Sequence, residues 1–172
     1  LGYGNNLPFY KNFYAGGYGS VRGYDNSTLG PKYPGVYYDA VGKQDWNPEE
    51  VGGNALVQFG TELALPIPFK GDWARQVRPV IFAEGAQVFD TQCNVPIGDK
   101  DGNIYVNGAK TNAQQYCKDN NQFDFGNMRY SVGVGFTWIT MIGPLSLSYA
   151  YPLNDKQGDK TKAVQFEIGR TF

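Results

Sequence analysis

The chain of 172 residues contains no histidine and only two cysteines. Without histidine it lacks the usual general base, the commonest zinc ligand, and the Ser-His and Cys-His pairs of nucleophilic catalysis. Asp, Glu, Ser and Lys are present, but they form no recognisable catalytic spacing. We therefore expect a protein that is not an enzyme and that holds neither a metal ion nor a cofactor.

The sequence also has little net charge and no long apolar run. Its 15 Lys and Arg residues balance 16 Asp and Glu residues, which gives no electrostatic reason to expect nucleic-acid binding. No apolar stretch approaches the roughly 18 residues of a membrane-spanning helix, so only strands could carry this chain across a bilayer. The chain starts at Leu1 without an initiator Met or a signal peptide, which we interpret as a mature chain or an excised fragment.

The residues that are abundant favour strands. The chain has 23 Gly and 10 Pro, which disfavour helix, and 11 Phe with 13 Tyr, which favour strand. Five segments alternate between apolar residues on one face and mostly Gly, Ser, Thr and Gln on the other. These segments are residues 54–65, 78–89, 129–138, 145–153 and 164–172. The predicted fold class is therefore all-β and antiparallel.

The connections between these segments indicate part of an up-and-down transmembrane β-barrel. Residues 1–52 form one long connection and residues 91–127 another, and they alternate with short turns as extracellular loops do with periplasmic turns. A soluble sandwich would carry more Lys, Glu and Asp on the second strand face. A closed bacterial barrel needs roughly eight strands or more, and unpaired edges in lipid are costly. We therefore expect residues 53–172 to supply about five strands of a larger barrel, or to pair at their edges with another chain, including a second copy.

The two cysteines, Cys93 and Cys117, lie in the same polar segment, which is rich in Asn, Asp, Gly and Gln, and they lack CxxC spacing. We predict a disulfide between them. In a loop of this length it would contribute about 3 kcal/mol, and it would persist only in an oxidising compartment. Two free thiols are the alternative.

A glycine-rich stretch surrounds the motif Val21-Arg22-Gly23-Tyr24. Such a backbone can pack closely and direct its single guanidinium at a carboxylate or a polar pocket. A solvated surface loop is the alternative. A phosphate site is not supported, because no Gly-Lys-Ser/Thr sequence follows.

The run Phe9-Tyr10-Lys11-Asn12-Phe13-Tyr14-Ala15-Gly16-Gly17, together with Val21-Arg22-Gly23-Tyr24, resembles the sixth extracellular loop of the BamA family of outer-membrane protein assembly factors, within the bacterial surface antigen family. The resemblance covers essentially the whole chain and matches it to the last five strands of that family's barrel. It implies a location in the Gram-negative outer membrane. It also implies that residues 1–52 contain a long inner loop.

In that family the Arg of the loop is held inside the barrel by an acidic residue in an aromatic-x-Asp-x-Gly pattern. The matching residues here are Phe82, Glu84 and Ala86, so Glu and Ala replace the family's Asp and Gly. The resemblance therefore implies that Glu84 points into the lumen and pairs with Arg22, although its longer side chain leaves the geometry of the pair open. Alternatively, Glu84 only lines a wet interior.

The last predicted strand carries Phe166, Ile168 and Phe172, which resemble the terminal recognition signal of outer-membrane barrels. In the family this strand also closes a weak lateral seam with the first barrel strand, and Gly169 resembles the glycine at which it kinks. We expect Gly169 to weaken the strand ladder locally, with relief of crowding as its alternative role. Arg170 is expected to extend its head to the membrane interface.

The resemblance implies a non-enzymatic insertase that folds β-barrel proteins into the outer membrane. Its expected partners are outer-membrane lipids, unfolded β-barrel clients and, through regions absent from this chain, accessory lipoproteins of the assembly complex. Two other classes stay open: a passive outer-membrane transporter of the same superfamily, and a small structural or adhesive surface barrel.

Overall fold

The computed structural model of the chain describes most of its residues. These are residues 11–34, 48–67, 71, 74, 76–93, 103–106, 109–141, 143–156 and 158–169. The chain divides into two compact units. Unit 1 comprises Leu1–Tyr14, Leu29–Val57 and Gln87–Asn127, and unit 2 comprises Ala15–Thr28, Gln58–Ala86 and Met128–Phe172.

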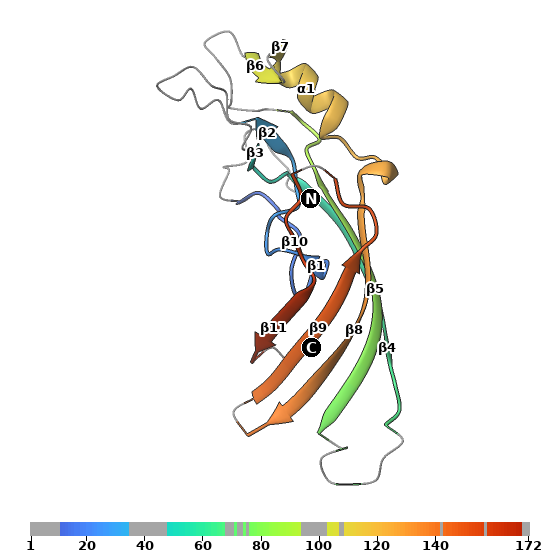
Figure 1. The fold of residues 1–172 in the computed structure, drawn as a ribbon. Coiled ribbons are helices and arrows are strands. Elements are labelled where there is room, and N and C mark those ends of the chain that lie inside the picture. The colour runs from blue at the N-terminus through green and yellow to red at the C-terminus, as the bar shows by residue number, and fades with distance from the viewer. Residues whose placement is uncertain are drawn as a thin grey trace. The chain divides into compact units, whose positions relative to one another are not determined.

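A five-stranded sheet with the order β11-β9-β8-β5-β4 is the largest element of the fold (Figure 1). The strand β8 pairs antiparallel with both β5 and β9, and β11 pairs antiparallel with β9. The strands are β4 (Ala55–Ala64), β5 (Val77–Phe89), β8 (Arg129–Thr140), β9 (Gly143–Pro152) and β11 (Val164–Ile168). The predicted all-β, antiparallel class is confirmed, and each alternating segment of the sequence corresponds to one strand.

The alternation gives the sheet of unit 2 two unlike faces. On the inner face, which carries the loop of residues 15–28, Ser131, Ser146 and Ser148 are buried. The outer face exposes apolar side chains instead: Val132, Val134, Phe136, Trp138, Tyr149, Tyr151, Phe166 and Ile168. An apolar face of this extent is a liability in water, and it matches the lipid-facing band of a transmembrane barrel.

A short two-stranded pairing joins the loop to the C-terminal region of unit 2. The strand β1 (Gly23–Tyr24) pairs antiparallel with β10 (Thr161–Lys162), so that Gly23 lies opposite Lys162. After one further residue, Ala163, the chain enters β11. The loop therefore pairs with the segment that leads directly into the last strand of the sheet.

Unit 1 contains smaller elements. The strand β2 (Lys32–Pro34) pairs with β3 (Pro48–Glu50), and β6 (Asn103–Val106) pairs with β7 (Ala109–Asn112). The helix α1 (Ala113–Asn120) and the 3-10 turn η3 (Phe125–Asn127) follow β7. No helix in the described part of the chain is long and apolar enough to span a membrane.

The helix α1 was not predicted from the sequence. Its N-cap is Asn112, whose side chain accepts the backbone N–H groups of Gln114 and Gln115. With only eight residues it is too short to be stable alone, so its surroundings must stabilise it.

Candidate functional site

The motif Val21-Arg22-Gly23-Tyr24 is buried in unit 2. Val21 and Tyr24 are fully covered, and Arg22 is 2% exposed. Gly23 has a φ of +95°, which favours glycine, and a Cβ at this position would lie 3.2 Å from the Cβ of Ala150 on the inner face. This burial excludes the alternative that the motif is part of a solvated surface loop.

Arg22 contacts Glu84 of β5 through three N–H groups. Its backbone N–H donates to Oε2 at 2.7 Å, Nε donates to Oε1 at 2.9 Å, and Nη2 donates to Oε1 at 2.5 Å. Glu84 is 9% exposed, so both charges are removed from bulk water and depend on each other. The longer Glu side chain, in place of the family's Asp, thus reaches both the side chain and the backbone of Arg22.

A second carboxylate, that of Glu62 on β4, also accepts a hydrogen bond from Nη2 of Arg22. Glu62 was not predicted from the sequence to be part of the site. A signal was present, because Glu62 lies on the polar face of its alternating segment. Since β4 and β5 are neighbours in the sheet, two carboxylates on adjacent strands share one guanidinium.

Two aromatic rings border the guanidinium of Arg22. Its Cζ lies 3.4 Å from the ring centroid of Phe82 and 5.3 Å from that of Tyr18. A planar guanidinium suits such contacts better than an ammonium does. Burial alone would lower the pKa of Arg22, but hydrogen bonds and charge attraction from Glu84 and Glu62 outweigh it and raise the pKa. Arg22 therefore stays charged at every pH that a cell encounters.

Tyr24 attaches the other end of the motif to the C-terminal strands. Its hydroxyl lies 3.4 Å from the carbonyl oxygen of Tyr130, and its backbone lies opposite Thr161 in the β1–β10 pairing. The next N–H group, that of Asp25, donates to the carbonyl of Lys160 at 2.7 Å. Burial raises the pKa of Tyr24 to about 12, so its phenol is neutral at physiological pH.

Two of the residues predicted to form the terminal recognition signal, Phe166 and Ile168, lie on β11. Phe166 and Ile168 are exposed on the outer face. In the described part of the segment 164–172 the regular ladder ends at Ile168, and Gly169 departs from strand geometry with a φ of +87°. Arg170 and Phe172 lie outside the described residues.

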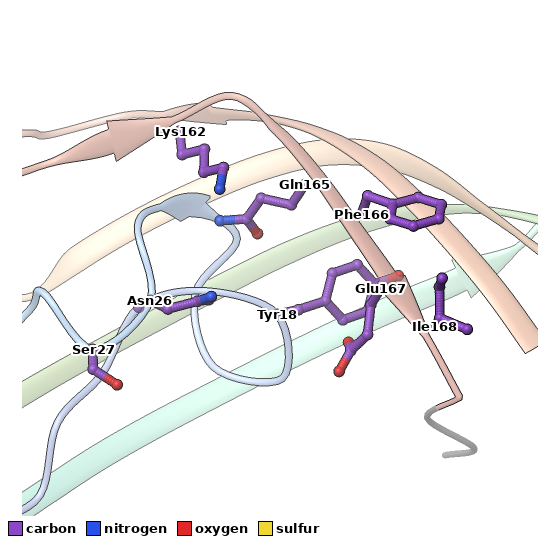
Figure 2. Close-up of a pocket in the computed structure, with 9 residues that line it drawn as sticks. Tyr18, Asn26, Ser27, Lys162, Gln165, Phe166, Glu167 and Ile168 are labelled. Carbon is purple, nitrogen blue, oxygen red and sulfur yellow. The ribbon is translucent and has the colours of Figure 1, made fainter.

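A polar cavity of about 580 Å³ lies between the loop of residues 15–28 and β11 (Figure 2). In Figure 2, Gln165 and Glu167 extend from β11 toward the loop, whereas Phe166 and Ile168 extend from the other side of the strand. Tyr18 lines the cavity from the loop. In the described ranges, no group of three or more Cys, Asp or Glu side chains could hold a metal ion.

The predicted disulfide between Cys93 and Cys117 is formed, and it belongs to unit 1. The two half-cystines are buried together with Ile104 and Ala113 in a small core. The disulfide thus connects the segment after β5 to α1 and stabilises a helix that is too short to form alone. It lies apart from the Arg22 site along the chain and contributes no group to it.

The chain is similar in sequence and in structure to proteins of one family. A sequence profile described as the Omp85 superfamily domain matches residues 1–172. The outer membrane protein assembly factor BamA of Neisseria meningitidis serogroup B is 38% identical over 99% of this chain, and the sorting and assembly machinery component 50 homolog of Bos taurus is 27% identical over 93%. The crystal structure of BamA from Haemophilus ducreyi lacking POTRA domains 1-3 matches 93% of this chain with a TM-score of 0.67 and 32% identity.

These relatives are much longer than this chain. The chain spans 20% of the Neisseria protein, 28% of the bovine protein and 27% of the Haemophilus structure. The match nevertheless includes the whole of the buried loop and the five strands to which it is attached. The chain belongs to the Omp85 superfamily.

Proposed function

We propose that this chain is the C-terminal part of a non-enzymatic insertase, a protein that folds β-barrel proteins and inserts them into the outer membrane. The outer membrane is its location, in agreement with its family and its apolar outer sheet face. In this proposal residues 1–52 and 91–127 are extracellular loops, and the first of them folds back so that Val21-Arg22-Gly23-Tyr24 lies in the lumen. The Neisseria relative of the same family is named an assembly factor.

The observation that carries this proposal is the ion-pair cluster of Arg22 with the buried Glu84 and the partly exposed Glu62. A buried charge network is costly to build, and it holds a loop against the inner face of the sheet instead of leaving that face open. A passive transporter of the same superfamily would carry an Arg-containing inner loop as well, so the cluster supports both classes, and the relatives named for assembly favour the insertase. An insertase needs a barrel whose terminal strand can change its pairing while the rest of the sheet stays ordered.

The strand β11 provides a physical route for insertion. It is at the edge of the described sheet and pairs with β9 on one side. The unpaired N–H and C=O groups of an edge strand can template an incoming strand by β-augmentation. Pairing of the incoming strand is strongly favoured in lipid, since each unsatisfied backbone group costs several kcal/mol there. Such a protein lowers a kinetic barrier without nucleotide hydrolysis and without making or breaking covalent bonds.

We propose the partners that the family resemblance implies. Outer-membrane lipids contact the outer face, unfolded β-barrel clients pair at the edge of β11, and accessory lipoproteins of the assembly complex bind regions outside this chain. Isolated from the rest of the barrel, the chain would self-associate through its edge strands.

Depletion of the full-length protein from cells tests this proposal. The readout is the folded fraction of several unrelated outer-membrane barrels, measured by heat-modifiable gel mobility. A broad fall in that fraction supports an insertase. If other barrels stay folded and only one exported or conducted substrate changes, the protein is a passive transporter or a surface barrel instead.

A further inference from the structure

Gln165 is the one residue of β11 whose side chain is buried. It is 5% exposed, whereas its neighbours Val164 and Phe166 are 55% and 56% exposed. It lies opposite Ser148 of β9, on the inner face of the sheet. In Figure 2 its amide nitrogen points at β1 of the loop.

The amide of Gln165 is bonded to the backbone of the Arg22 motif. Its Nε2 donates to the carbonyl oxygen of Tyr24 at 2.6 Å, across 141 positions of sequence. Its Oε1 is buried and accepts no hydrogen bond from the described residues. The residue therefore makes one short contact to the loop, and loss of its N–H group would leave a buried carbonyl without that donor.

Arg22 and Tyr24, two positions apart in the loop, thus contact strands at opposite edges of the sheet. Arg22 is fixed to Glu84 of β5 and Glu62 of β4, and Tyr24, two positions later, is fixed to Gln165 of β11. Because β4 and β11 are the two edges of the described sheet, the stretch 22–24 spans its inner face. A displacement of β11 must either break the contact of Gln165 or move the loop.

We infer that Gln165 is a positioning residue that couples the Arg22 loop to the terminal strand, so that the stability of one depends on the other. This inference rests on the proposed function only for the role of the coupling. That role is to link the position of the Arg22 loop to the opening of the β11 edge, at which clients pair. The coupling itself is a property of the protein without a client.

A double-mutant cycle in the full-length protein tests the coupling. Hydrogen exchange at the backbone amides of β11 is measured for Gln165→Met, Arg22→Lys and the double variant. We expect Gln165→Met to speed exchange in β11 by about fivefold or more, since it removes one buried hydrogen bond. Arg22→Lys should also speed this exchange although Arg22 does not contact β11, and the double variant should be little faster than the faster single variant.

Two further variants keep the test decisive. Exchange is also measured at loop residues 21–25, which Gln165→Met should speed and which Val164→Thr, a change on the outward side of the same strand, should leave unchanged. If Gln165→Met does not form a heat-modifiable barrel, Gln165→Asn replaces it, because it retains the amide but shortens its reach.

The coupling would be overturned if exchange in β11 of Arg22→Lys is unchanged. It would also be overturned if the rate increases of the two single variants simply multiply in the double variant. Client folding is measured separately. If clients fold normally but the coupling is absent, only this inference is rejected. If the wild-type protein folds no client, the proposed function is rejected.

Discussion

At the scale of single residues, the two carboxylates that bind Arg22 are not equivalent. Glu84 accepts three N–H groups and is buried, whereas Glu62 accepts one and its side chain is 33% exposed. Removing one partner of a buried ion pair costs about 3 to 5 kcal/mol, whereas partly exposed pairs contribute about 1 kcal/mol or less. The position of each carboxylate therefore decides its contribution.

Glu84→Gln should loosen the loop far more than Glu62→Gln. We expect the free energy of loop opening to fall by about 3 kcal/mol for Glu84→Gln and by about 1 kcal/mol or less for Glu62→Gln. Hydrogen exchange at residues 21–25 of the full-length protein measures both values. Each variant removes one negative charge and keeps nearly the same volume, so each is a control for the other. Equal effects would contradict the geometry described above.

Tyr24 makes the loop sensitive to alkali. Burial raises its pKa from 10.0 to about 12, because the phenolate is disfavoured inside the protein. The neutral phenol therefore contributes stability that is complete below about pH 10 and is lost as the pH rises toward 12. The urea midpoint of the wild-type protein should fall more steeply between these pH values than that of Tyr24→Phe. If the urea midpoints of the two proteins fall equally with pH, burial does not raise the pKa of Tyr24.

The sequence could predict only part of this site. Arg22 and Glu84 are 62 positions apart, and alternation alone places Glu84 on a strand face without naming its partner, so the pair followed from a motif resemblance. Glu62 required knowledge that β4 and β5 are neighbours, which periodicity does not contain. Gln165 was on the polar face of its segment, but nothing local indicated a bond to Tyr24.

At the scale of elements, the five long strands were predictable because period-two alternation continues over most of their length. The pairing of β1 with β10 was not, since two residues are too few to show a period. The helix α1 was missed because it is short and polar, and because a cap, a cross-link and a small core stabilise it rather than a continuous apolar face.

Removal of the disulfide should release α1 and leave the sheet intact. Cys93→Ser combined with Cys117→Ser removes a cross-link over 24 positions, which we expect to destabilise this segment by about 3 kcal/mol. Hydrogen exchange should become faster in β7 and α1 and stay unchanged in β8 and β9, which belong to unit 2. Faster exchange in β8 would contradict a purely local role for the disulfide.

Gly169→Ala tests the end of β11. The backbone of Gly169 is left-handed, and a Cβ there would meet no atom within 4 Å, so only backbone strain of about 1 to 2 kcal/mol opposes the substitution. The N–H of Gly169 donates to the carbonyl of Pro144 at 2.9 Å, and exchange of the residue 169 amide should become faster in the variant. Gly169→Asn should have a smaller effect, because Asn tolerates this conformation. An equal effect of both substitutions would exclude backbone strain as the cause.

At the scale of the whole molecule, the sheet combines an apolar outer face with a charged, loop-covered inner face. The fold class followed from composition and alternation, because lipid on one side and a lumen on the other impose opposite demands on alternate residues. The proposed function did not follow in the same way, since an insertase that makes and breaks no covalent bonds would have no catalytic motif to detect. The resemblance of the Arg22 loop supplied that part, and the family match over residues 1–172 supports it.

The folding rate of a client in lipid vesicles tests the central claim most directly. The full-length protein is reconstituted into vesicles without nucleotide, a urea-denatured outer-membrane barrel is added, and its folding is followed by heat-modifiable gel mobility. The account predicts faster folding than in protein-free vesicles, and a smaller acceleration with Glu84→Gln. A client that folds at the same rate with and without the wild-type protein would contradict the account.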